Sequence, residues 1–441
     1  MGAAEQSASL DWARYLDALA AFGMKPGLER VSWLLQALGN PQRRFRSVHV
    51  VGTNGKSSTT RYVEGLLRAH GLRSAAYLSP HIAGYEERVI VGGRPVAAAA
   101  FGRAVDKVRV ATAGMPRDLE EATQFEVLTV AAFLAMADEG VEAAAVEAGL
   151  GGRLDATNVL HAPVVVLTNV GLEHTEVLGD TREAIFAEKA AVIHGGDALF
   201  GELDGLEVLA RDVCETAGAR LHALGDDVLL SGGPGDFLVD VRCDPPRLYD
   251  GLSVPTPARY QTGNAALAVA AAHLLLGGLD PAAVRAGLAA VTVPGRLQVV
   301  REQPLVIADG AHNAPGMATM IESLAGLELP RPRVALLAIL RDKSVDKMVG
   351  SLLPLVDIVV CTQTHEPRSL NALELAAKVR SHGMDPQAAI EEPLEAFDAA
   401  LRAAGPGGSL LVTGSLYLLE DLARALGQGP DGPPRGYTSD S

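Results

Sequence analysis

The sequence predicts an α/β protein whose two domains each contain a mostly parallel sheet. A β-branched apolar run, Ser47–Gly52, is followed by GTNGKSS and then by apolar residues at helical spacing up to Gly71. Strand-like and helix-like segments go on alternating to Asn169, and a fresh alternation begins at Leu305, after the breaker Pro294-Gly-Arg296. Such alternation is typical of parallel strands covered by helices.

Composition limits the class of protein. A chain of 441 residues with a 48% hydrophobic share can form two or three well-packed domains. A formal net charge of −15 argues against general affinity for nucleic acid or anionic membranes. Cys214, Cys243 and Cys361 show no metal-binding spacing and are expected to be structural, in a reducing compartment. Without a stretch of about twenty apolar residues, a cytoplasmic protein is expected.

Each element follows from its local pattern. Helices are expected over Leu10–Phe22 and Leu28–Leu38, on either side of a Gly- and Pro-containing breaker. The elements expected next are the strand Ser74–Ser79, a hairpin around Val91–Arg94, the helix Glu121–Glu139, the strands Ala143–Glu147 and Pro163–Asn169, and a helix from about Thr181.

The second half of the chain divides at the Pro294-Gly-Arg296 breaker. A short antiparallel sheet over 231–257 and an alanine-rich helix, Ala265–Leu276, are expected before it. The strands expected after it are Leu305–Asp309, Val334–Leu340, Ile358–Thr362 and Leu410–Thr413. The predicted domains are therefore 1–296 and 297–426, with a disordered Gly-, Pro- and Ser-rich tail over 427–441.

GTNGKSS has the pattern of a phosphate-binding loop between a strand and a helix. Unpaired N–H groups and the helix dipole favour an anion there, and Lys56 adds a full positive charge. The alternative is a glycine turn with an exposed lysine, because Val50 stands where the general pattern has glycine. The residues predicted to bind a nucleoside triphosphate are Gly52, Thr53, Asn54, Gly55, Lys56, Ser57 and Ser58.

Glu147 is predicted to lie at the carboxyl end of a parallel strand, before the glycine-rich EAGLGGRLDATN. A nicotinamide cofactor is rejected because Leu154 stands where the dinucleotide fingerprint needs glycine. Glu147 and His174 are suitable Mg²⁺ ligands, although singly each has a structural interpretation. On the residues alone, Lys189 beside Glu188 is interpreted as an exposed charge pair, and Asn264 as a helix N-cap or a base-recognition amide.

Taken together, these motifs resemble the folylpolyglutamate synthase and dihydrofolate synthase family of Mur-type ligases. The resemblance covers roughly residues 10–425 and departs from the common pattern at Ser57, often glycine, and Ala148, often valine. The motifs in chain order are GTNGKSS, SPH from Ser79, TQFE from Thr123, EAGLGGRLDATN, EHTEVLG, EKAAVI, NAALA from Asn264, PGR and DGAHN.

This resemblance implies a P-loop, Mur-ligase-like first domain and a smaller Rossmann-like α/β second domain. It also implies ATP-dependent ligation of L-glutamate to dihydropteroate or reduced folates through an acyl phosphate, in folate biosynthesis and one-carbon metabolism. Lys189, which lies 15 positions after His174, matches the lysine that is carbamylated in the family, so the charge-pair interpretation is replaced. The implied reactants are small molecules, with no nucleic acid or membrane, and a monomer is expected.

The resemblance also implies roles for particular residues. Lys56, Lys189 and His174 are assigned to catalysis, and two Mg²⁺ sites are expected with Ser79, Glu147 and His174 as ligands. Asn264, Arg296 and Asp309 are assigned to ATP, in addition to the loop residues. The residues assigned to the pterin or glutamate substrate are Thr123, Arg153, Leu154, Asp155 and His312.

Two alternatives stay open at this point. Another Mur-type ligase, such as a cell-wall amino-acid ligase, is disfavoured because only about 46 residues precede the first strand, too few for a further full domain. A non-catalytic nucleotide-binding regulator is disfavoured because Glu147, His174 and Lys189 are all present.

Overall fold

The computed structural model describes residues 3–20, 25–80 and 84–427, so most of the expected tail lies outside the described residues. The chain forms two compact units. The first contains Met1–Gly232, Asp236–Ser253 and Gly263–Val291, and the second contains Gly233–Gly235, Val254–Thr262 and Thr292–Ser441. Each unit has its own mostly parallel sheet, which confirms the predicted α/β class.

The first unit is organised around an eight-stranded sheet of order β4-β3-β2-β5-β1-β6-β7-β8. Its central strand β1 pairs in parallel with both β5 and β6, which places the ends of these three strands side by side. The strands are β1 (Arg46–Val51), β2 (Ser74–Tyr77), β3 (Val89–Val91), β4 (Arg94–Pro95), β5 (Ala143–Glu147), β6 (Val164–Asn169), β7 (Gly196–Glu202) and β8 (Ala219–Ala223).

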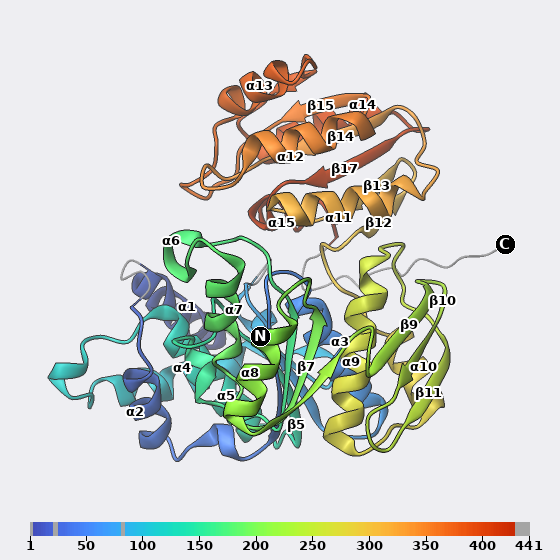
Figure 1. Cartoon of the computed structure of the whole chain (residues 1–441). Coiled ribbons are helices and arrows are strands. Elements are labelled where there is room, and N and C mark those ends of the chain that lie inside the picture. The colour runs from blue at the N-terminus through green and yellow to red at the C-terminus, as the bar shows by residue number, and fades with distance from the viewer. Residues whose placement is uncertain (1–2, 21–24, 81–83, 428–441) are drawn as a thin grey trace. The chain divides into compact units, whose positions relative to one another are not determined.

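Helices cover this sheet on both sides, with α4 and α5 on one side and α3 and α9 on the other (Figure 1). The helices up to residue 291 are α1 (Ala3–Ala20), α2 (Glu29–Ala37), α3 (Lys56–Ala69), α4 (Ala98–Thr112), α5 (Gln124–Asp138), α6 (Thr175–Leu178), α7 (Arg182–Ala190), α8 (Glu207–Ala217), α9 (Tyr260–Leu276) and α10 (Pro281–Ala289). The sequence interpretation did not identify α4, α6, α8 and α10. Alanines and an interior glycine weaken the periodicity of α4, and α8 lies where only strands and loops were expected.

The predicted hairpin and antiparallel sheet are both confirmed. Strands β3 and β4 pair antiparallel around the Val91–Arg94 turn. A separate three-stranded sheet of order β11-β10-β9 contains β9 (Val228–Gly233), β10 (Asp236–Val241) and β11 (Arg247–Leu252).

The second unit contains a six-stranded sheet of order β12-β13-β17-β14-β15-β16. The predicted strands correspond to β13 (Leu305–Ala308), β14 (Arg333–Leu337), β15 (Ile358–Cys361) and β17 (Ser409–Thr413), whereas β12 (Gln298–Glu302) is an unpredicted antiparallel edge strand. The remaining elements are the strand β16 (Ala388–Ala389) and the helices α11 (Ala314–Ala325), α12 (Val345–Leu352), α13 (Ala372–Ser381), α14 (Pro393–Ala404) and α15 (Leu416–Asp421).

The three cysteines are free thiols in the interior, as expected for structural residues. Burial raises the pKa of Cys214 and Cys243 to about 11 and that of Cys361 to about 12, so the thiols stay protonated near neutral pH. Among the described residues, no helix combines the length and apolar character that crossing a membrane requires.

A buried ion pair fixes the N-terminal helices on α5. The Nη2 of Arg30 in α2 lies 2.9 Å from Oε1 of Glu126, and the side chains are 9% and 4% exposed. Glu126 also accepts hydrogen bonds from the backbone N–H and the hydroxyl of Thr123, at 2.7 and 3.0 Å. Thr123 is therefore the N-cap of α5, and the predicted helix start at Glu121 is three residues too early.

Replacing Glu126 with alanine is expected to destabilise the first unit by about 3 to 5 kcal/mol, because Arg30 would stay buried without a counter-charge. The measurement is the urea midpoint of unfolding followed by circular dichroism. Asp138→Ala, which breaks the exposed pair with Lys107, is the matched control and should cost about 1 kcal/mol or less. Equal shifts for the two variants would contradict the role given to the buried pair.

Candidate active site

The loop between β1 and α3 is held in place by the end of β6. The N–H of Thr53 donates to the Asn169 carbonyl at 3.0 Å, and that of Asn54 donates to Asn169 Oδ1 at 2.9 Å. The Thr168 hydroxyl donates to the Asn54 carbonyl at 2.6 Å. This places the loop outside the carboxyl ends of β1 and β6, where open α/β sheets bind ligands.

Glycine is required where this loop leaves β1. Gly52 has φ +146°, and a Cβ atom there would lie 1.9 Å from the Thr168 hydroxyl. Gly55 has φ +85° and precedes α3, and a Cβ atom there would lie 2.4 Å from Asn264 Oδ1. Any larger residue at either position would displace the loop.

Two lysines from distant elements donate to one carbonyl group. Lys56 Nζ donates to the Gly52 and Thr53 carbonyls at 2.9 and 3.0 Å. Lys189 Nζ, from α7, also donates to the Gly52 carbonyl at 2.9 Å and lies 3.7 Å from Glu173 Oε1. The two ammonium groups therefore lie close together on the loop, a concentration of positive charge suited to a phosphate.

Lys189 is buried, which corrects the interpretation of an exposed charge pair. Its side chain is 2% exposed, and Glu188 pairs instead with Arg153 at 2.8 Å. Burial and the nearby Lys56 lower the pKa of Lys189 to about 8, which favours the neutral amine more than in an exposed lysine.

The Glu147 carboxylate lies at the start of α3. It is buried at the end of β5 and accepts hydrogen bonds from the Ser57 hydroxyl at 2.9 Å and from the Ser79 N–H at 3.2 Å. Within the described ranges, no group of three or more His, Cys, Asp and Glu side chains could hold a metal ion. The oxygen groups that the structure brings together here are the Glu147 carboxylate and the Ser57 hydroxyl, with the Ser79 N–H bound to the same carboxylate. His174 lies exposed at the N-terminus of α6 with φ +48°.

Two of the side chains assigned to the pterin, those of Asp155 and Arg153, form hydrogen bonds within the protein. The Asp155 carboxylate accepts hydrogen bonds from the N–H groups of Leu150 and Thr157, at 2.8 and 2.9 Å, and burial raises its pKa. Arg153 is bound to Glu188, and Leu154 is 49% exposed. Their direct contact with a substrate stays a prediction.

Asn264 is not an N-cap, because α9 begins at Tyr260 and runs through it. Its side chain is buried, and Oδ1 points at the Gly55 turn of the loop. Of the two interpretations left open by the sequence, the N-cap is therefore wrong, and Asn264 belongs to the surroundings of the loop.

The predicted residues Arg296, Asp309 and His312 belong to the second unit. Asp309 accepts hydrogen bonds from the N–H groups of Leu297 and Ala311, both at 2.8 Å, and from the Tyr260 hydroxyl at 3.2 Å. Burial raises its pKa, and Arg296 acts against that shift. His312 Nδ1 donates to the Gly310 carbonyl at 2.9 Å. Asp309, the first residue of DGAHN, thus binds both its own loop and Leu297, the residue that follows PGR.

Sequence reasoning missed the residues that support this site from other elements. Thr168 and Asn169 brace the loop, and Glu173 lies beside Lys189. The sequence could have indicated Asn169 as a site residue, because it ends a predicted parallel strand as Glu147 does. The pairing of Ser57 with Glu147 and of Lys189 with Glu173 depends on tertiary contacts.

This architecture is that of a Mur-type ligase. Residues 50–197 match the Mur ligase middle domain, and residues 295–416 match the Mur ligase, glutamate ligase domain. The dihydrofolate synthase/folylpolyglutamate synthase of Mycobacterium tuberculosis is 35% identical to this chain, over 85% of this chain and 82% of the relative. Its counterpart in Bacillus subtilis is 30% identical, over 92% of this chain and 96% of that relative. The chain therefore belongs to the dihydrofolate synthase/folylpolyglutamate synthase family and is a ligase.

Solved structures agree with this assignment. Folylpolyglutamate synthase of Mycobacterium tuberculosis, complexed with ADP, has a TM-score of 0.89 and 32% identity and covers 97% of this chain and 100% of that one. Escherichia coli FolC, in complex with DHPP and ADP, has a TM-score of 0.86 and 30% identity over 95% and 97%. A bifunctional folylpolyglutamate synthase/dihydrofolate synthase with Mn, AMPPNP and L-glutamate bound has a TM-score of 0.83 and 31% identity over 94% and 98%.

Replacing Gly52 with alanine is expected to reduce ADP affinity about tenfold or more, because the new methyl group would overlap Thr168 and displace the loop. Affinity would be measured by isothermal titration calorimetry. Gly71→Ala is the matched control: Gly71 also has a positive φ, but a Cβ atom there meets nothing within 4 Å. A Gly52→Ala protein that binds ADP like the Gly71→Ala protein would contradict this account of the loop.

Proposed function

We propose that this chain couples ATP cleavage to ligation of L-glutamate onto both dihydropteroate and reduced folates. The observation that carries the proposal is that the ammonium groups of Lys56 and Lys189 both donate to the Gly52 carbonyl. In the same loop, the Ser57 hydroxyl donates to the Glu147 carboxylate. Two anions, the γ-phosphate and the substrate carboxylate, must approach each other in the first step. Concentrated positive charge lowers the energy of that approach.

The residues present fit a divalent cation. The Glu147 carboxylate and the Ser57 hydroxyl offer oxygen donors at a phosphate-binding loop, as hard cations prefer, and the backbone of Ser79 is bound to the same carboxylate. We propose Ser79, Glu147 and His174 as Mg²⁺ ligands and two Mg²⁺ sites in all. When bound, the cation offsets charge on the phosphate oxygens.

The proposed reaction has two steps. The substrate carboxylate oxygen attacks the γ-phosphorus of ATP, the bond to the β-phosphate oxygen breaks, and an acyl phosphate and ADP result. The α-amino group of glutamate then attacks the acyl carbon, loses a proton, and expels phosphate to leave an amide. The roles of Arg296, Asp309, His312 and Asn264 toward ATP or substrate, and of Thr123, Arg153, Leu154 and Asp155 toward the pterin, belong to this proposal.

Lys189 is proposed to be carbamylated. Its neutral amine would attack CO₂, and loss of one proton would leave a carbamate anion with two oxygens, able to face a cation. Burial and Lys56 favour the neutral amine that this step requires. We also propose 1–296 as the ATP-binding domain and 297–426 as the glutamate-ligase domain of a cytoplasmic monomer.

The test is to incubate the protein with ATP, Mg²⁺ and L-glutamate, and with either dihydropteroate or a reduced folate. Release of ADP and a glutamylated product are expected with both pterin substrates. If product forms with reduced folates alone, the dihydropteroate half of the proposal is wrong. If no ADP is released with either pterin substrate, a nucleotide-binding regulator is favoured.

Replacing Lys56 with alanine is expected to lower turnover at least about a hundredfold, because the charge that faces the phosphates is lost. Circular dichroism should show an intact fold, since the ammonium donates to the loop carbonyls of Gly52 and Thr53 rather than to a side chain of the core. The exposed Lys107→Ala variant is the control. Turnover within a factor of about three of wild type would contradict the assignment of the loop.

Carbamylation predicts a ¹³C NMR carbamate signal when the protein is supplied with ¹³CO₂, without any need for turnover. The signal should grow between about pH 6.5 and pH 8.5, because the amine loses its proton as pH rises through a pKa of about 8. The Lys189→Arg variant should lack the signal. Persistence of the signal in that variant, or its absence from an active wild-type protein, would refute the modification.

A further inference from the structure

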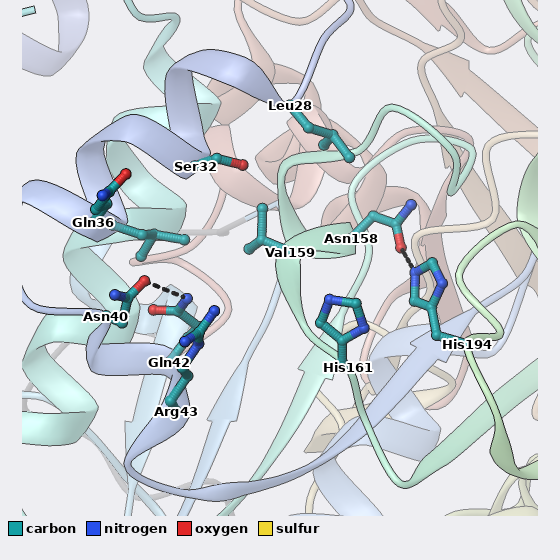
Figure 2. Close-up of a pocket in the computed structure, with 11 residues that line it drawn as sticks. Leu28, Ser32, Gln36, Asn40, Gln42, Arg43, Asn158, Val159, His161 and His194 are labelled. Carbon is teal, nitrogen blue, oxygen red and sulfur yellow. Dashed lines mark hydrogen bonds between the residues drawn. The ribbon is translucent and has the colours of Figure 1, made fainter.

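A cavity of about 610 Å³ lies in the first unit, and none of the residues assigned to the ligase site lines it, although its wall residue Asn158 is bonded to the backbone of Arg153. Asn40, Gln42 and Arg43 precede β1, His161 precedes β6, and His194 precedes β7. Two of these strands, β1 and β6, carry or brace the phosphate-binding loop at their opposite, carboxyl ends. The other lining residues are Leu28, Ser32, Leu35, Gln36, Asn158 and Val159. Figure 2 shows the α2 side chains facing the segment that carries Asn158, Val159 and His161.

The charged and titratable side chains of this cavity are all basic. Arg43, His161 and His194 line it, and no Asp or Glu does. Over the described ranges, Arg43 forms no ion pair, although the whole chain has a formal net charge of −15. In so acidic a protein, a cavity lined only by basic charge favours an anion.

The hydrogen bonding of the histidine pair fixes which nitrogen of His194 can gain a proton. Asn158 Nδ2 donates to the Arg153 carbonyl at 2.9 Å, so Oδ1 is left to accept from His194 Nε2, at 2.9 Å. The second nitrogen of His194, Nδ1, then carries a proton only when the ring is charged. The rings of His161 and His194 lie 4.9 Å apart, and burial and His161 lower the pKa of His194. A bound anion would act against this shift.

The rest of the wall fits the body of a small molecule. Gln42 is 9% exposed; its Nε2 donates to Asn40 Oδ1 at 3.3 Å, while its Oε1 finds no partner in the described part of the chain. Leu28, Leu35 and Val159 add apolar surface. The volume lies within the range of ligand sites, which combine apolar walls with a few placed polar groups.

We propose that this cavity is a second ligand site, separate from the ligase centre, for a small organic anion in which a carboxylate or phosphate is attached to an apolar ring. Arg43 and the two histidines hold the anionic group, and α2 and Val159 contact the ring.

The probes are benzoate and phenyl phosphate, titrated by calorimetry into protein saturated with ADP and Mg²⁺. At least one is expected to bind with a Kd below about 1 mM. The stronger of the two identifies the anionic group. Arg43→Ala should weaken binding about tenfold, because a charge-assisted hydrogen bond is lost. Arg44→Ala, an exposed arginine that does not line the cavity, is the matched control and should bind as wild type does.

The pH dependence gives a second measurement. Because burial and His161 lower the pKa of His194, benzoate should bind more tightly as pH falls from about 6.5 to 5, and His194→Gln should reduce this dependence. The other titratable groups nearby are His161, Arg43 and the buried His49, whose pKa is lowered to about 3 by burial and by His194, so it stays neutral.

The proposal is overturned if neither probe binds with a Kd below about 1 mM, if Arg43→Ala and Arg44→Ala behave alike, or if the probes compete with ADP. Unchanged ADP affinity in the Arg43→Ala protein shows that the variant is folded. Because the proposed ligase reaction does not use this cavity, failure here leaves that reaction untouched, and failure of the ligase assay does not affect these titrations.

Discussion

The Gly52 carbonyl is the contact on which the candidate site depends. It lies where β1 ends, and it accepts hydrogen bonds from the Lys56 and Lys189 ammonium groups. Neither lysine could be held there without the sharp turn at Gly52, and that turn is possible because a residue without a side chain passes beside Thr168. Strand β6 therefore positions the loop, and the loop positions the charges.

Strand order explains why residues distant in sequence meet here. Because β1 lies between β5 and β6, the carboxyl ends of all three strands deliver Gly52, Glu147 and Asn169 to one edge of the sheet. Helix α7 then brings Lys189 to the same edge. The arrangement concentrates positive charge and buried carboxylate in a small volume, where electrostatic effects are stronger than in water.

The opposite edge of the sheet has a different chemistry. There, Arg43 and the His161–His194 pair surround a cavity with no acidic lining residue. The two edges are separated by the length of the strands, so a ligand at one edge makes no contact with a ligand at the other.

The sequence by itself determined the fold class, the order of most elements and the family. These depend on local patterns: the strand–GTNGKSS–helix segment, the alternation of apolar runs, and the ordered motifs. Local patterns also placed Glu147 at a strand end. Alanines and an interior glycine concealed α4, whereas α8 lies in a stretch where only strands and loops were expected.

Only the tertiary structure decided how the side chains are used. It buried Lys189 beside Lys56 and gave Glu188 to Arg153, whereas sequence neighbours had indicated a Glu188–Lys189 pair. It also placed Asn264 inside α9 next to Gly55, where sequence position had favoured an N-cap. The physical reason is that burial, charge proximity and pKa depend on elements that pack together from distant parts of the chain, and local sequence does not record them.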